Sequence, residues 1–272
     1  MFSSRNGIET ENRDRLERLH REICGPFDAA QAAIVWATEL PRTRRLLAHL
    51  ATRGWLARVR RGLYVTVPLG ATTPAEWRAD PWAVAARSFN PCYVSGWSAC
   101  EHWELTEQIF RDVAVVTSAP VRQNQVVIQG THYHLMHRPA ARIFGTKSVW
   151  RDHVQIRISD PTRTVVDILD VPRLGGGIRH VADVLNVYFG GAHRNDRLLV
   201  EYAKKLGNRT VFKRLGFLLE ALEIDASDLI AKCFAMRSSG LTSLDPTMNR
   251  RGRLSKRWNL RVNANIRREE LR

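Results

Sequence analysis

The stretch from residue 40 to residue 67 most narrowly limits how this chain can fold. It starts with LPRTRRLLAHLATRG, where leucines recur at helical spacing, Pro41 stands in the first turn and Gly54 ends the pattern. The segments WLARV and LYVTV follow, and each alternates in the period of a strand on either side of an Arg-Arg-Gly turn. We therefore predict a helix that is followed directly by a β-hairpin, with Gly62 in the turn.

Two further helices are predicted before this stretch. Apolar residues recur at helical spacing over Arg13–Ile23, and Asp28 with Gln31 three residues later forms a capping-box start for the next helix. Three helices followed by a hairpin are typical of a winged helix–turn–helix domain, which we expect over residues 1–70. The segment Pro68–Trp77, rich in Pro, Gly and Thr, is the predicted linker.

The remainder, residues 71–272, mixes helix and strand patterns. Alternation predicts strands at DVAVVT, NQVVIQ, THYHLM and HVQIRI, whereas PWAVAARSF, GWSACEHW and DPTRTVVDILD predict helices. From about residue 176 to residue 240 the pattern is mainly helical. One of these helices carries an apolar stripe, formed by Val211, Leu215, Leu218 and Leu222. The predicted fold class is α+β, with a winged helix–turn–helix followed by a larger mixed α/β domain that ends in a helical subdomain.

The charge of the chain points to anionic partners. A formal net charge of +15 and a pI of about 10.6 imply attraction to nucleic acid or to an anionic membrane surface. From Pro41 to Arg61 there are seven arginines and no Asp or Glu, so positive charge is concentrated on the predicted helix and hairpin. No apolar run approaches a membrane span and no signal segment is evident, so we expect a cytoplasmic protein without membrane contact. The four scattered cysteines contain no CxxC pair and are expected to be free thiols.

The predicted helix over residues 40–52 has an apolar face and an opposite cationic face. The apolar face consists of Leu40, Leu46, Leu47 and Leu50. The cationic face consists of Arg42, Arg45 and His49, with Arg44 at the flank. Such a helix fits the major groove of DNA, where the fork of an arginine side chain pairs with guanine. The hairpin would place Arg58, Arg60 and Arg61 beside phosphate or the minor groove. These side chains predict binding to double-stranded DNA, with a solvated basic surface as the alternative.

Two motifs resemble chemical sites without completing them. His132 and His134 share one face of a predicted strand, with His137 nearby, and this spacing suits zinc, but no cysteine or carboxylate partner is evident. The segment GWSAC approximates the nucleophile elbow GxSxG around Ser98, but Cys100 replaces the last glycine. We expect no catalytic residue, no metal and no cofactor, and therefore no enzyme.

Three further features leave alternatives open. Asp160 and Asp167 could hold magnesium in a nuclease, but Asp160 also suits a helix N-cap, and the Glu-x-Lys motif of restriction-type nucleases is missing. The glycines Gly175–Gly177 open a helix and could cradle a phosphate, but the Lys-Ser/Thr of a P-loop is missing. The acid-free stretch Asn249–Asn265 is either a second nucleic-acid contact or a solvated tail with an edge strand at RWNLRVN.

Five segments together resemble the AbiEi family of antitoxins, from toxin–antitoxin systems classed as type IV. They are RVRRGLYV, YVSGWSACEHWEL, ISDPTRTVVDILD, KRLGFLLE and the closing LDP…RWNLRVN, within residues 27–263. The resemblance implies an N-terminal winged helix–turn–helix that binds inverted repeats in its own promoter and represses the operon. It also implies a C-terminal antitoxin domain that counteracts AbiEii, a nucleotidyltransferase-like toxin, with no stable complex required.

The resemblance carries the DNA-binding role onto six residues of this chain. They are Arg42, Thr43, Arg44, Arg45, Arg60 and Arg61, although Thr43 falls toward the apolar face of its helix. His49 and Arg58 join the predicted DNA-binding set from the charge pattern alone. Two other functions stay open: a winged-helix regulator whose C-terminal domain senses a small ligand, and a DNA-binding nuclease that depends on Asp167.

Overall fold

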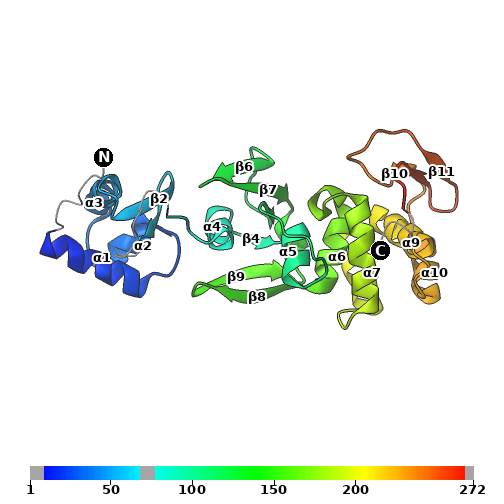
Figure 1. Ribbon diagram of the computed structural model, residues 1–272, viewed down its shortest axis with the longest axis horizontal. Helices are drawn as coiled ribbons and strands as arrows, with labels where there is room; N and C mark the ends of the chain where they lie inside the picture. Colours follow the sequence, from blue (N-terminus) through cyan, green and yellow to red (C-terminus); the bar gives the residue numbers. More distant parts are fainter. Residues whose placement is uncertain (1–8, 68–76, 267–272) are drawn as a thin grey trace.

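The computed structural model describes residues 9–67 and 77–266 and shows an elongated molecule (Figure 1). An N-terminal unit of helices and one small sheet is followed along the long axis by a six-stranded sheet, a group of helices and another small sheet. The predicted α+β class is confirmed. Residues 68–76, which make up most of the predicted linker, lie outside the described residues.

The N-terminal unit packs three helices against a short antiparallel sheet. Its elements are α1 (Thr10–Glu22), β1 (Phe27–Asp28), α2 (Ala29–Trp36), α3 (Leu40–Thr52), β2 (Leu56–Arg60) and β3 (Leu63–Thr66). The strand order is β1-β3-β2. The predicted capping box is confirmed, because Asp28 Oδ1 accepts a hydrogen bond from the Gln31 amide at 3.0 Å and Gln31 Oε1 accepts one from the Asp28 amide at 3.2 Å.

The middle of the molecule is a mixed sheet in the order β6-β7-β5-β4-β9-β8, in which the β5–β7 and β4–β9 pairs are parallel. Its elements are α4 (Pro81–Ser88), β4 (Cys92–Val94), α5 (Gly96–His102), β5 (Val113–Thr117), β6 (Gln125–Ile128), β7 (Thr131–His137), the 3₁₀ turn η2 (Ala140–Arg142), β8 (Thr146–Arg151) and β9 (Val154–Ser159). The sequence pattern predicts neither β4 nor β8. Strand β4 has only three residues, and β8 is an edge strand whose side chains are all at least partly exposed.

The C-terminal part is a helical group capped by a small sheet. Its elements are α6 (Pro161–Asp170), η3 (Pro172–Gly175), α7 (Ile178–Gly190), α8 (Asp196–Leu206), α9 (Thr210–Ala221), α10 (Ser227–Met236), β10 (Thr242–Ser243), β11 (Arg253–Ser255) and β12 (Leu260–Val262). The predicted apolar stripe of α9 and its C-cap, formed by Val211, Leu215, Leu218 and Leu222, is buried in the helical core. The expectation of an edge strand at RWNLRVN is wrong, because β12 is the central strand of the order β10-β12-β11.

The N-terminal sheet belongs to two hydrophobic cores at once. Leu56 and Tyr64 pack with the helices α1 to α3, whereas Val59, Leu63 and Val65 pack with the core of the six-stranded sheet. Side chains alternate across a strand, so one hairpin can bury both of its faces in this way. The hairpin is therefore fixed between the helices and the middle of the molecule, and the two predicted domains share a core.

All four cysteines are free, as predicted, and three of them are buried. No helix within residues 9–67 and 77–266 combines the length and apolarity needed to cross a lipid bilayer.

Candidate nucleic-acid interface

Helix α3 separates its apolar and cationic side chains as predicted. Leu47 and Leu50 are buried in the core of the N-terminal unit, while Arg42, Arg45 and His49 are exposed on the other side. Arg44 is exposed as well. The separation follows from the helical period of 3.6 residues, since the exposed cations recur three and four positions apart.

Thr43 is not available for DNA contact, which corrects its inclusion in the DNA-binding set. The residue is 0% exposed. Its Oγ1 donates to the Glu39 carbonyl oxygen at 3.0 Å and lies 2.8 Å from Thr38 Oγ1. Thr43 therefore holds the first turn of α3 to the preceding turn, because its hydroxyl is satisfied inside the protein.

The β2–β3 hairpin presents the second group of arginines. Arg58, Arg60 and Arg61 are exposed, and a β-bulge shifts the register between Arg58 and Arg60. Gly62 lies at the turn with φ of +77°, a conformation that other residues rarely adopt. Arg60 Nη2 donates to the Ser88 carbonyl oxygen at 3.3 Å, so this arginine also joins the hairpin to α4.

Most of these cations have no partner among the residues that the structure describes. Neither an ion pair nor a hydrogen bond of the side chain is present for Arg42, Arg44, Arg45, His49, Arg58 or Arg61. Elsewhere arginines do pair, for example Arg87 with Asp28 at 2.8 Å. A group of exposed, unpaired guanidinium groups leaves a local positive potential, which attracts a polyanion.

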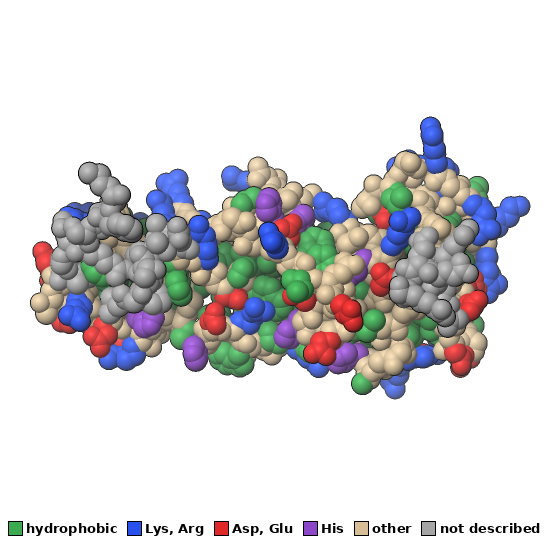
Figure 2. Space-filling model, viewed as in Figure 1, with side chains coloured by type: hydrophobic (Ala, Val, Ile, Leu, Met, Phe, Trp, Pro, Cys, Tyr) green, Lys and Arg blue, Asp and Glu red, His purple; other side chains and the backbone are tan. Residues whose placement is uncertain are grey.

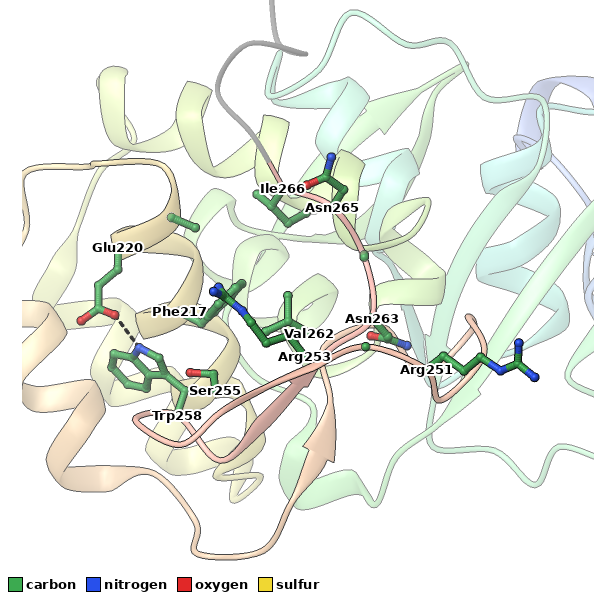
Figure 3. A pocket seen from close by; sticks show the side chains of 13 residues that line it. Phe217, Glu220, Arg251, Arg253, Ser255, Trp258, Val262, Asn263, Asn265 and Ile266 are labelled. Atoms are coloured by element: carbon green, nitrogen blue, oxygen red, sulfur yellow. Dashed lines mark hydrogen bonds between the residues drawn. The ribbon is translucent and has the colours of Figure 1, made fainter.

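A second basic surface lies at the other end of the molecule. Figure 2 shows Lys and Arg side chains gathering around the end that carries β10 and β11, while acidic side chains gather over the middle part. Here a groove of about 800 Å³ is lined by Phe217, Glu220, Arg251 and Arg253, among others. Figure 3 shows Arg253 within this groove and Arg251 directed away from its centre. Glu220 is engaged, since it accepts a hydrogen bond from Trp258 Nε1 at 2.6 Å.

The histidines of the strand β7 do not form a metal site. His134 Nε2 lies 3.0 Å from Asp112 Oδ2, whereas His132 Nδ1 lies 3.2 Å from Gln125 Nε2. Over residues 9–67 and 77–266, no group of three or more His, Cys, Asp or Glu side chains is placed to hold a metal ion.

Ser98 is a structural residue and not an exposed nucleophile. It is almost fully buried, and its Oγ accepts a hydrogen bond from the Ala114 amide at 3.1 Å. A nucleophile at an elbow needs an accessible hydroxyl, so the GWSAC segment anchors α5 to β5 instead.

Asp160 and Asp167 each have a structural role. Asp160 caps α6 by accepting from the Arg163 amide at 2.8 Å. Asp167 is buried and binds Arg163 Nε through Oδ1 at 2.9 Å, while Ser95 Oγ donates to its Oδ2 at 2.7 Å. Burial raises the pKa of Asp167, and the nearby guanidinium of Arg163 acts in the opposite direction. Both carboxylate oxygens of Asp167 are thus engaged inside the protein.

The glycine run does not offer a free phosphate cradle. Gly176 and Gly177 have φ of +77° and +94°, and α7 begins directly after them. The Ile178 amide in the first turn of α7 donates to Asp245 Oδ2 at 2.9 Å. A carboxylate of the chain itself therefore occupies the anion position at this helix N-terminus.

Sequence reasoning missed the buried polar network that joins three of the segments quoted above. Tyr93 OH donates to Asp167 Oδ2 at 3.0 Å and accepts from Arg163 Nη2 at 2.9 Å. Arg214 Nη1, from KRLGFLLE, donates to the carbonyl oxygens of Leu169 and Asp170 at 2.8 and 2.9 Å. One signal was present in the sequence, because Arg163 and Asp167 stand four residues apart on α6, the spacing at which side chains of opposite charge can pair.

The comparisons with known proteins show a fold and no family. No protein-family model matches the chain, and no curated protein matches it. Among solved structures, the chain is similar to the crystal structure of the RV2827C protein from Mycobacterium tuberculosis, with 14% identity and a TM-score of 0.65. The match covers 93% of this chain and 92% of that chain. At this identity the likeness shows that the two chains share a fold over nearly their whole length.

Proposed function

We propose that this protein is a DNA-binding transcriptional repressor. The observation that carries the proposal is the set of exposed cations on α3 and on the β2–β3 hairpin, most of which have no partner among the described residues. Helix α3 would serve as the recognition helix and the hairpin as the wing of a winged helix–turn–helix. Base contacts by Arg42 and Arg45 would select the sequence. The wing arginines Arg58, Arg60 and Arg61 would bind phosphate and fix the orientation.

We also propose that the protein is an antitoxin, encoded in an operon like those of the AbiE type. It is supported by the resemblance of five segments to the AbiEi antitoxins. The partner would be a nucleotidyltransferase-like toxin that the protein counteracts without a stable complex. The protein would also bind inverted repeats in the promoter of its own operon and repress it.

A salt-titrated mobility shift on the upstream DNA tests the DNA-binding part. If about five phosphates are neutralised, log K should fall with log salt at a slope of about −4 to −5. Arg45→Ala should cost about 1–3 kcal/mol and relax the preference at one base pair, while Arg61→Ala should weaken all sequences alike and reduce the slope by about 1. Arg197→Ala is the matched control, because its side chain is 90% exposed on α8 and carries the same charge.

The same variants separate repression from toxin neutralisation. The full-length chain is needed, since fragments would expose the core that the hairpin shares with the six-stranded sheet. When the neighbouring toxin is co-expressed, Arg45→Ala with Arg61→Ala should lose promoter repression and still rescue growth. If neither change alters the DNA affinity or its salt slope, the DNA-binding assignment is wrong. Loss of rescue together with repression would refute the separation of the two roles.

A further inference from the structure

A pocket lies where the hairpin meets the middle of the molecule. Its volume is about 450 Å³, which falls in the range of about 300–1,000 Å³ that is typical of small-molecule sites. It is lined by the end of β2, the C-terminal end of α4, the loop that follows β5, and residues of β6 and β7. This pocket is separate from the groove of Figure 3, which lies beside β11 and β12.

The walls of the pocket are mainly apolar. Phe89 and Leu135 are buried, and Val121 and Val126 are half-buried and pack against the core of the six-stranded sheet. Such walls favour an apolar ligand body, because covering them removes apolar surface from water.

The charged groups of the pocket are all cationic. Arg60 and Arg122 line it, and none of the described residues that line it is acidic. Arg122 is exposed and has no ion pair or hydrogen bond with the described part of the chain. Two guanidinium groups beside an apolar cavity match the planar, bidentate geometry of a carboxylate.

A buried hydroxyl in the same lining lacks a partner. Ser88 lines the pocket, and its Oγ is buried without a hydrogen bond to any described residue. Buried polar atoms are satisfied in most native proteins, so this hydroxyl is an exception in the wall of the pocket.

We propose that this pocket binds a small organic carboxylate with an apolar chain or ring. Arg60 and Arg122 would hold the carboxylate, and the apolar walls would cover the rest of the ligand. One consequence rests on the proposed DNA-binding function: a ligand that engages Arg60 removes a wing cation from the DNA contact. The ligand would therefore act as an effector that weakens DNA binding.

Titration calorimetry on the full-length protein tests the site directly, with octanoate and phenylacetate as probes. At least one of the two should bind saturably at millimolar concentration, and octanamide, which has the shape of octanoate without its charge, should bind more weakly. Arg122→Gln should weaken the binding about 10- to 100-fold, as expected for one lost charge-assisted contact. Ala119→Phe, which fills the pocket from its wall, should abolish it. Arg111→Gln is the control, because Arg111 is an exposed arginine outside the pocket.

The possible results test the carboxylate site and the proposed DNA-binding function separately. The site is refuted if neither probe binds, or if Arg122→Gln and Ala119→Phe bind the probe as well as the wild type does. If the probe binds and the affinity for duplex DNA is unchanged in a mobility shift, the effector role is wrong while the site stands. If the wild type binds no DNA at all, the proposed function fails and calorimetry alone decides the site.

Discussion

Replacing Asp167 by Asn should destabilise the protein strongly, although the two side chains have the same shape. The Arg163 side chain is 0% exposed and that of Asp167 is 7% exposed, with 2.9 Å between Nε and Oδ1. Arg163 Nη1 already has no hydrogen-bond partner within the described residues. The substitution removes the only charge bound directly to this buried guanidinium in the described structure, and an uncompensated buried charge costs about 3–5 kcal/mol.

The loss should be visible in thermal unfolding. For a chain of this size a change of 1 kcal/mol shifts the melting temperature by about 2–4 °C, so Asp167→Asn should lower it by about 6–20 °C. The double variant Arg163→Met with Asp167→Leu should lose less than the single variant, because it removes both charges. At a temperature where Asp167→Asn is still folded, its affinity for DNA should equal that of the wild type.

Two results would refute this reasoning. A loss below about 1 kcal/mol for Asp167→Asn would mean that the pair is solvated or that Arg163 finds another partner. A double variant that is no more stable than the single variant would mean that the two charges are not coupled.

Two further predictions concern the C-terminal part. Burial alone would raise the pKa of Asp245, but hydrogen bonds to its carboxylate lower the pKa below the usual 3.8. The ionised Asp245 therefore stabilises the folded protein above pH 3.8, and this contribution is lost as the pH falls through the lowered pKa. Asp245→Asn should therefore cost about 1–3 kcal/mol at neutral pH in denaturant unfolding, partly through the weakened bond to the Ile178 amide, and the difference from the wild type should shrink toward pH 3. Gly216→Ala should cost about 1–3 kcal/mol, because the new Cβ would overlap the indole of Trp258, while the control Gly190→Ala, with open space around it, should change the stability little. Equal stabilities of these two glycine variants would contradict the close packing of α9 against Trp258.

The local elements of the fold follow closely from the sequence. Helix α2 begins directly after its N-cap Asp28, because the Asp28 and Gln31 side chains satisfy each other's backbone amides and both residues lie within one turn. The β2–β3 hairpin is predicted because Gly62 permits the left-handed turn between two alternating segments. The cationic face of α3 is equally local, since the helical period alone places Arg42, Arg45 and His49 together.

Contacts between distant segments were decided only by the tertiary structure. By sequence Asp167 is a candidate metal ligand, but in the structure its carboxylate accepts hydrogen bonds from Tyr93 and Ser95. Both of these residues lie more than 70 positions earlier in the chain. Asp245 fills the helix N-terminus after the glycine run in the same way. No local pattern encodes such pairings, because they depend on which elements pack together.

The sequence by itself determined most of the helices, the β2–β3 hairpin, the caps at Asp28 and Asp160 and the arginine-rich face, since each of these depends on residues within a few turns of one another. The tertiary structure decided the surroundings of those elements. It buried Thr43, engaged both carboxylate oxygens of Asp167, and fixed the hairpin between two cores so that Arg60 borders a pocket. The physical reason is that burial and hydrogen-bond pairing are properties of packed neighbours, whereas helical period, capping and turn geometry are properties of the chain itself.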